Sequence, residues 1–282
     1  MLRIANFLPH ILNLHGDYAN VGAVCRILDQ AGINYVCDEI NSSDLSSFHF
    51  LNYDMCLMAS GEIDQFSAVK AWLESYQLVD ELKEFIDQGR VLLVTGTTVA
   101  FFGHSVLRED GECECLGLLP LHARERQYVY ADDLLSAIEL TTPEGTKRMH
   151  LWGAQVHLVD CDFTTHDAST TPQGSVLGEL LYGYGNNGRS LHEGWKLNNS
   201  FFTMMHGPVC VYNPWFTCAL ISYALRSKPE LSDDYQRFVE ASQHFDFSEE
   251  REARECFRRR LVTKEQGEAS AKSPDLATTQ LM

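Results

Sequence analysis

The sequence has little positive charge, no long hydrophobic run and no paired pattern of cysteines. Its 282 residues include 22 Lys and Arg against 39 Asp and Glu, a formal net charge of −17. A nucleic-acid-binding surface is not expected, because neutralising phosphates requires clustered Lys and Arg side chains. No apolar segment approaches the roughly 18 residues that a membrane-spanning helix needs. The apolar start of the chain is interrupted at Pro9 and His10, too early for a signal peptide.

Nine cysteines are scattered singly along the chain. An odd number without the spacing of a disulfide framework is typical of reduced thiols inside the cell. The phosphate-binding motif G-x-x-x-x-G-K-[ST] is also missing, so a P-loop function is not indicated. We therefore expect a cytoplasmic acidic protein.

What the sequence does contain is an alternation of apolar strands and amphipathic helices. Residues 2–7 predict a buried strand, and Val21, Val24 and Leu28 then mark one face of a helix that Gly32 would end. Further strands are expected at residues 33–36, 53–58 and 90–95, with a helix at 78–88. The last of these strands is almost continuously apolar, as in strands buried on both faces of a parallel sheet. The pattern predicts an α/β fold with a doubly wound, mostly parallel sheet flanked by helices.

The second half contains shorter β-like runs and ends in charged segments. The runs lie at residues 127–130, 154–159, 176–182 and 200–204, and a helix follows from 214 to about 225. We expect one globular domain over residues 1–227 and a charged helical extension over 228–262. Residues 263–282 predict a disordered tail, because their polar composition cannot bury enough surface to order the chain.

Some segments could carry chemistry. The apolar strand before Thr95 leads into Gly96 and what looks like a helix start. Such a turn can present a nucleophile at the edge of a sheet beside backbone N–H groups that form an oxyanion hole. An ordinary strand–helix turn built from small residues would have the same sequence pattern. The loop at residues 59–65 and two histidines at strand ends, His157 and His206, are also candidates, and each can equally be structural.

Three spaced motifs together resemble the glutamine amidotransferases of the CobB/CobQ type, in particular the GatD group of lipid II isoglutaminyl synthase. They are Leu12-Asn13-Leu14-His15-Gly16-Asp17-Tyr18-Ala19-Asn20, Gly185-Asn186-Asn187 with Glu193-Gly194, and His206-Gly207-Pro208 with Asn213-Pro214. The resemblance covers about residues 2–225. It implies a class I, flavodoxin-like fold for residues 1–227, and no cofactor. It also implies a subunit that hydrolyses L-glutamine with a Cys–His pair and passes ammonia to a Mur-ligase-like partner of the MurT type, as a heterodimer. That partner amidates the D-glutamate of the peptidoglycan stem peptide.

The chain departs from the family at the nucleophile. The family's elbow reads Cys-Gly-Gly-Tyr-Gln, and we align Thr95 with the cysteine and His206 with the catalytic histidine. A threonine hydroxyl is a far weaker nucleophile than a thiolate. By the same resemblance Gly61, Gly96, Arg126 and His157 fall at substrate-binding positions, although the surrounding residues differ.

Three hypotheses follow. The chain can be a GatD-like subunit that hydrolyses glutamine poorly or not at all, an active amidotransferase using Thr95 and His206, or a binding module that reuses the pocket. No metal site is expected, because the spacing of the nearby metal-binding residue types matches no standard zinc site; these residues are His157, Asp160, Cys161, Asp162 and His166.

Overall fold

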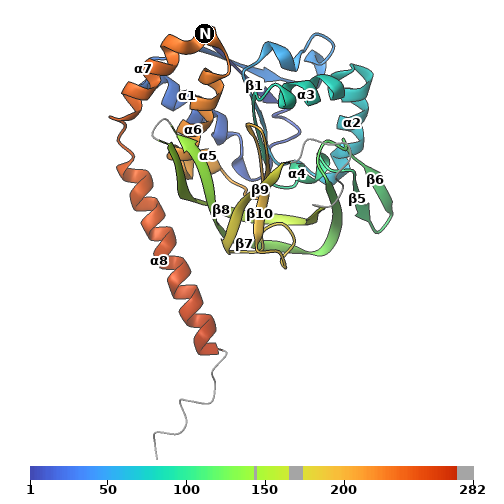
Figure 1. Cartoon of the computed structure of the whole chain (residues 1–282). Helices are drawn as coiled ribbons and strands as arrows, with labels where there is room; N and C mark the ends of the chain where they lie inside the picture. Colours follow the sequence, from blue (N-terminus) through green and yellow to red (C-terminus); the bar gives the residue numbers. More distant parts are fainter. Residues whose placement is uncertain (143–144, 165–173, 272–282) are drawn as a thin grey trace, which may run out of the picture. The chain divides into compact units, whose positions relative to one another are not determined.

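The computed structural model describes residues 1–142, 145–164 and 174–271 (Figure 1). The chain divides into two compact units, Met1–Phe245 and Asp246–Met282, which are described separately. The first unit contains an 11-stranded sheet and all of the predicted site residues.

Five strands form the parallel half of the sheet. Their order is β2 (Tyr35–Ile40), β1 (Leu2–Phe7), β3 (Met55–Met58), β4 (Val91–Thr95) and β11 (Ser200–Thr203). Every residue of β3, β4 and β11 is buried, which explains their apolar sequences. Carboxyl ends of parallel strands meet at one edge of a sheet, and β4 and β11 bring Thr95 and Thr203 into register there. This edge carries the candidate site.

Two groups of helices flank the parallel strands (Figure 1). One group comprises α1 (Ala19–Gln30), α5 (Val209–Tyr212), α6 (Pro214–Arg226) and α7 (Ser232–Ser242), and the other comprises α2 (Phe66–Ser75) and α3 (Leu78–Asp87). Each helix buries an apolar face; in α3 it consists of Leu78, Leu82, Phe85 and Ile86. The predicted α/β fold, with a doubly wound, mostly parallel sheet flanked by helices, is confirmed.

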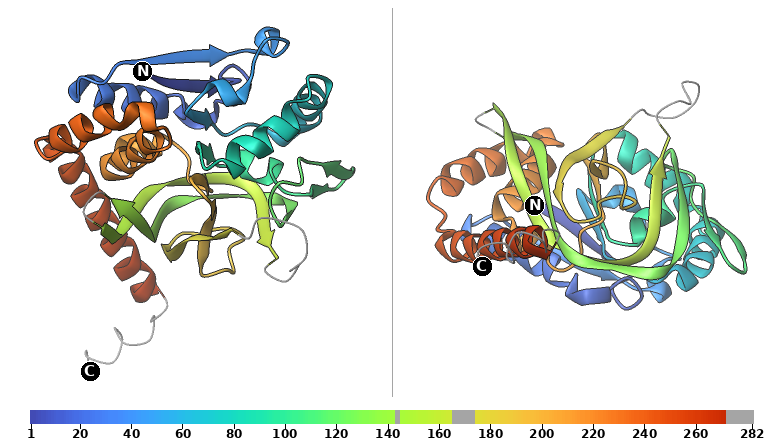
Figure 2. Two further views of the ribbon diagram at one scale, coloured as in Figure 1. Left: turned by 45° about the horizontal axis from the view of Figure 1, so that its top comes forward. Right: turned by 90° about the horizontal axis from the view of Figure 1, so that it is seen from below.

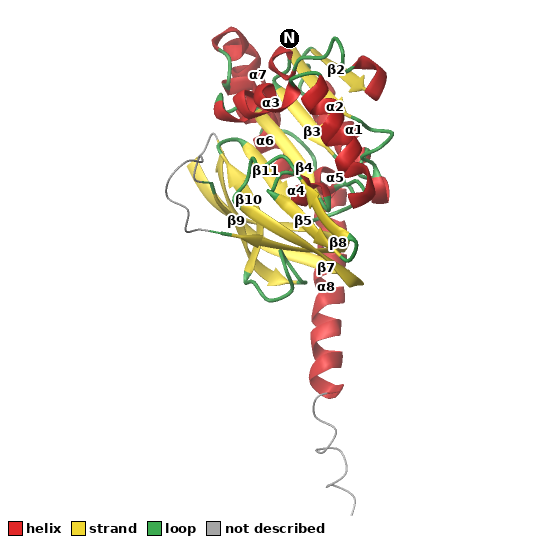
Figure 3. Ribbon diagram, turned by 90° about the vertical axis from the view of Figure 1, so that its right-hand side faces the viewer, coloured by secondary structure: helices red, strands yellow, loops and turns green. Residues whose placement is uncertain are grey.

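Residues 105–197 extend this sheet through mostly antiparallel pairings. Beyond β11 follow β10 (His192–Leu197), β9 (Ser175–Tyr182), β7 (Leu121–Thr142), β5 (Ser105–Arg108) and β6 (Gly111–Glu114), and β8 (Gly145–Phe163) pairs with β7. β7 and β8 form a long curved antiparallel pair (Figure 2, right; Figure 3). The predicted runs at 127–130 and 154–159 lie inside these two strands but were much too short.

Two helices end at the glycines that the sequence predicted. Gly32 and Gly89 adopt positive φ values of 64° and 70° directly after α1 and α3, as predicted helix-stop glycines should. The strand predicted at residues 33–36 was misplaced, because β2 runs from Tyr35 to Ile40. β2 is an edge strand of the sheet and is only partly buried. Because it contains polar residues, a search for apolar runs did not find its full length.

The second unit contains one long helix, α8 (Ser248–Ala271). It continues past residue 263, where the tail was predicted to begin, and residues 272–282 lie outside the described part of the chain. The division at 228 and 263 stays a prediction. No helix among the described residues is both long and apolar enough to cross a membrane.

Candidate functional site

The turn after β4 has the geometry of a nucleophile elbow, and its apex is Gly96. Gly96 has φ +59°, and the short helix α4 (Thr98–Phe101) begins two residues later. A Cβ atom on Gly96 would lie 2.5 Å from Cε1 and 2.8 Å from Nδ1 of His206. It would also lie 2.6 Å from Oγ of Ser60. A side chain at position 96 would therefore point directly at His206, but the space that it would need is already filled.

The structure fixes His206 at the end of β11. The residue is fully buried, and its backbone N–H donates to the carbonyl of Ala154 on β8 over 2.7 Å. Its ring lies 6.2 Å from that of His157, centroid to centroid. The long β7–β8 pair thus positions both predicted histidines on one side of the elbow.

Asp17, from the first motif, lies beneath the elbow and joins three segments. Its Oδ2 accepts hydrogen bonds from the N–H of Ser60 at 3.1 Å and from Oγ1 of Thr95 at 2.9 Å. The backbone of Gly207 is a third hydrogen-bond partner. Burial raises the pKa of the Asp17 carboxyl from 3.8 to about 6, and these hydrogen bonds oppose the rise. The hydroxyl of Thr95 is therefore committed to Asp17, and Thr95 is only 1% exposed.

Two backbone N–H groups lie where an oxyanion hole would be built, one in the elbow and one in the facing loop. The N–H of Thr97 donates to Oγ of Ser60 at 3.1 Å. The N–H of Gly61 donates to Oγ1 of Thr98 at 2.8 Å. Both groups are thus satisfied by side-chain hydroxyls of the protein itself. A substrate oxygen would have to displace these hydroxyls before it could use either N–H group.

A cavity of about 280 Å³ opens beside the elbow. Among its lining residues are Gly61, Thr97 and His157, together with the carboxylates Glu62, Asp64 and Glu125. Burial lowers the pKa of His157 from 6.5 to about 4, so this imidazole is neutral at pH 7. Its Nε2 lies 2.7 Å from the side-chain amide nitrogen of Gln155.

Arg126 is held apart from this cavity. It forms an ion pair with Asp160, with Nη1 3.0 Å from Oδ1, and its guanidinium lies 3.8 Å above the ring of Tyr130. It lines a neighbouring hollow on the other side of Glu125. The structure brings Gly61, Gly96 and the two histidines to one edge of the sheet, and a substrate role for Arg126 stays a prediction.

The sequence analysis gave no role to Glu193 and Asn213, although both lie in the quoted motifs. Glu193 is fully buried on β10 and accepts hydrogen bonds from Oγ1 of Thr203 at 2.7 Å and the N–H of Met204 at 2.8 Å. Burial raises the pKa of Glu193 from 4.5 to about 7. Asn213 holds the backbone of Trp152 through both its N–H, at 2.9 Å, and its carbonyl, at 2.6 Å. For Asn213 the available signal was a polar residue within a largely apolar stretch, residues 209–216.

In the part of the chain that the structure describes, no three His, Cys, Asp or Glu side chains are grouped so that they could hold a metal ion. His166, one of the residues weighed for zinc, lies outside the described residues.

A tight turn that follows a buried parallel strand and faces a histidine is the kind of place where α/β enzymes present a nucleophile. Sequence comparison shows that the chain is similar to glutamine amidotransferase subunits. The chain is 27% identical over 230 residues to the GatD subunit of the glutamine-hydrolysing lipid II isoglutaminyl synthase of Staphylococcus aureus, covering 80% of this chain and 86% of GatD. It is 22% identical over 235 residues to the GatD subunit of Streptococcus pneumoniae, covering 80% and 82%. The resemblance predicted from the motifs is confirmed.

No protein-family model matches the sequence. Comparison with solved structures finds a glutamine amidotransferase from Thermotoga maritima, with a TM-score of 0.45 and 10% identity over 85% of this chain and 96% of that one. Another is a glutamine amidotransferase from Methylobacillus flagellatus, with a TM-score of 0.41 and 10% identity over 82% and 75%.

Proposed function

We propose that this chain is a GatD-type subunit of an amidating complex that has lost cysteine-based glutamine hydrolysis. The position of the nucleophile in this proposal is Gly96 rather than Thr95. One observation carries the proposal: a Cβ at Gly96 would lie within 2.8 Å of Nδ1 of His206, yet glycine supplies no side chain there. Thr95, by contrast, directs its hydroxyl to Asp17.

The hydroxyls of Ser60 and Thr98 support the same conclusion. Removing a single oxyanion-hole donor costs an enzyme roughly 10²–10³ in kcat. Here the N–H groups of Thr97 and Gly61 are both already hydrogen-bonded within the protein. The chain therefore combines a missing nucleophile with two occupied N–H donors, and hydrolysis by another residue of the elbow would meet the same obstacle.

The proposed partner is a Mur-ligase-like synthetase of the MurT type, which would bind this chain as a heterodimer and use free ammonia. The similarity to two GatD subunits over four-fifths of the chain supports this part of the proposal. A second candidate function, binding of a small molecule without hydrolysis, is supported by the cavity of about 280 Å³ beside the elbow. Such a volume is close to the lower end of ligand pockets, roughly 300 Å³.

The test is ammonia and glutamate release from L-glutamine, by the chain alone and with a MurT-type ligase, beside the GatD subunit of S. aureus. We expect no release above background from this chain. Release that disappears in Thr95→Ala and in His206→Ala would overturn the proposal and make Thr95 the nucleophile. Isothermal titration with L-glutamine tests binding without hydrolysis.

A pair of cysteine variants tests the position of the nucleophile. Gly96→Cys places a thiol against His206, and combining it with Ser60→Gly removes the hydroxyl that would collide with the new Cβ. We expect rapid reaction of iodoacetamide with the Gly96→Cys/Ser60→Gly thiol and slow reaction with Thr95→Cys. A faster reaction of Thr95→Cys would place the nucleophile at residue 95, and equal rates would contradict the assignment to Gly96. The wild-type chain measures the background reaction of the native thiols.

A further inference from the structure

A second cavity, of about 370 Å³, lies at the opposite ends of the parallel strands from the elbow. It is lined by Thr141, Lys196, Asn199, Tyr223, Arg226 and Ser227. Asn199 immediately precedes β11, and its side-chain amide donates to the carbonyl of Gly89, just before β4, at 2.7 Å. Since Thr95 and Thr203 close the other ends of these two strands, the cavity is separate from the candidate site.

The lining of this cavity is cationic, although the chain as a whole carries a net charge of −17. Lys196 and Arg226 both line it, and no acidic residue lines it among the residues that the structure describes. Several other lysines and arginines pair with carboxylates, as Lys70 does with Glu74 at 2.5 Å and Arg108 with Asp64 at 2.7 Å. Among the described residues, no carboxylate lies within ion-pair distance of Lys196 or Arg226.

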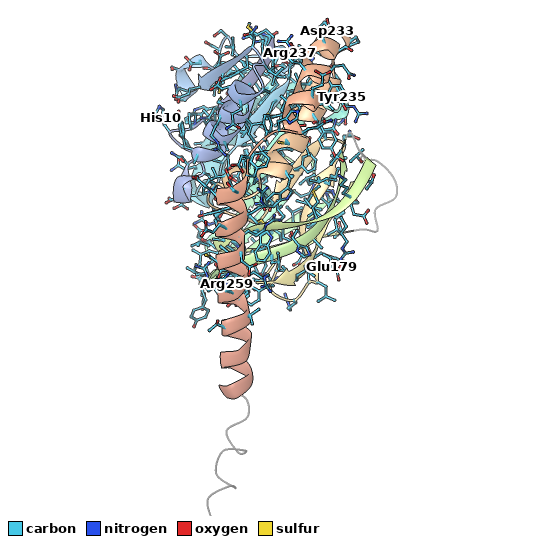
Figure 4. All side chains as sticks on the ribbon, turned by 90° about the vertical axis from the view of Figure 1, so that its left-hand side faces the viewer. His10, Glu179, Asp233, Tyr235, Arg237 and Arg259 are labelled. Carbon is cyan, nitrogen blue, oxygen red and sulfur yellow. The ribbon has the colours of Figure 1, made fainter. Side chains whose placement is uncertain are left out.

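Aromatic rings support both cations instead. The ammonium of Lys196 lies 5.5 Å from the ring centre of Phe201, which stacks on Tyr223 at 5.9 Å. The guanidinium of Arg226 lies 5.8 Å from the ring of Tyr235, which Figure 4 labels on α7. Cation–π contacts attract a positive group but do not neutralise its charge. Lys196 is half-buried, and burial lowers its pKa, as expected for an ammonium removed from water without a counter-ion.

We propose that this cavity, defined by Lys196, Arg226 and the hydrogen-bonding groups of Asn199, Tyr223 and Ser227, binds a small phosphate-bearing molecule. Two positive charges match a phosphate monoester, which carries a charge of about −1.5 to −2 at pH 7. A guanidinium supplies paired N–H donors to phosphate oxygens, and an ammonium supplies a point charge.

Isothermal titration of the full chain with inorganic phosphate, pyrophosphate and succinate, at constant ionic strength and pH 7.5, tests the proposal. We expect phosphate and pyrophosphate to bind with a stoichiometry of one. Lys196→Met and Arg226→Met should each weaken binding about tenfold or more, because each removes a charge-assisted contact. Lys196→Arg keeps the charge and should retain most of the affinity.

Lys83→Met is the matched control, because Lys83 is exposed on α3 and pairs with Asp87 at 2.5 Å. Circular dichroism and thermal unfolding establish that each variant is folded. The proposal is overturned if neither phosphate nor pyrophosphate binds at about 10 mM, far above the Kd of a specific site. Affinities unchanged in Lys196→Met and Arg226→Met would also overturn it, as would succinate binding as tightly as pyrophosphate. The outcome is independent of glutamine hydrolysis, which depends on the elbow.

Discussion

Glu193 makes the folded state sensitive to pH, and replacing it by glutamine should remove that sensitivity. The carboxyl group is fully buried beneath the strand that leads to His206, and burial raises its pKa from 4.5 to about 7. Between these two values the unfolded chain is ionised at residue 193 while the native protein holds the proton. Proton binding by Glu193 therefore stabilises the folded state fully below pH 4.5, and this contribution is lost as the pH rises through 7.

The size of the effect follows from the difference between the two pKa values, 7 − 4.5, or about 2.5 units. One unit corresponds to about 1.36 kcal/mol, so ionisation of Glu193 should lower the free energy of unfolding by about 3 kcal/mol. Most of this loss falls between pH 5 and pH 8. Glu193→Gln keeps a carbonyl oxygen that can accept from Thr203 and Met204, but it cannot ionise. The variant should thus gain stability relative to the wild type as the pH rises.

Urea denaturation followed by tryptophan fluorescence, at pH 5, 6, 7 and 8, measures this difference. Comparing variant with wild type at each pH cancels the contribution of the other carboxyls, including that of Asp17. Glu179→Gln is the control, because its side chain is 56% exposed on the adjacent strand β9 (Figure 4). A difference between Glu193→Gln and wild type that stays constant from pH 5 to pH 8 would refute the reasoning.

Three further predictions concern the polar groups around the site. Asn213→Ala should lower the free energy of unfolding by about 3 kcal/mol in urea denaturation, because it leaves several buried backbone groups without partners; a loss no larger than that of an exposed Asn→Ala variant would contradict this. His157 should stay neutral down to about pH 4. The stability that its neutral form contributes is present above pH 6.5 and is lost as the pH falls through 4. An NMR titration of the His157 ring with a midpoint near 6.5 would be inconsistent with its burial. Ser60→Ala leaves the N–H of Thr97 without its acceptor and should destabilise by about 1–2 kcal/mol, whereas unchanged urea midpoints would show that water replaces the hydroxyl.

Much of the fold could be predicted because its parallel half obeys simple patterns. β1 and the start of α3 were placed at the right residues, and both helix-stop glycines were identified. β7 and β8 were predicted only in fragments. These strands are 22 and 19 residues long and alternate between buried and exposed stretches, so no continuous apolar run marks them. Their length depends on pairing with each other, and a local window cannot detect such pairing.

The site could be located but not resolved from the sequence. Strand-end positions made the elbow, His157 and His206 candidates, and the alignment with the family placed Thr95 at the nucleophile, whereas the function proposed from the structure places it at Gly96. The distinction between residues 95 and 96 depends on one backbone angle, the positive φ of Gly96, and on the direction of a Cβ that glycine does not have. The hydroxyl groups that occupy the backbone N–H donors come from Ser60 and Thr98, which are 38 residues apart, 98 − 60, and meet only in the fold.

The residues that match the family most clearly stabilise the fold whatever chemistry takes place there. Asp17, Glu193 and Asn213 are buried, and each ties together segments that are distant in sequence. Replacing any of them would leave buried groups without hydrogen bonds, a loss of stability that is independent of catalysis. A glycine in place of a nucleophile at residue 96 has no such penalty, because a positive φ suits glycine better than any other residue. The matching motifs therefore measure how much of the scaffold is kept, whereas under the proposed function position 96 and the hydroxyls around it decide the chemistry.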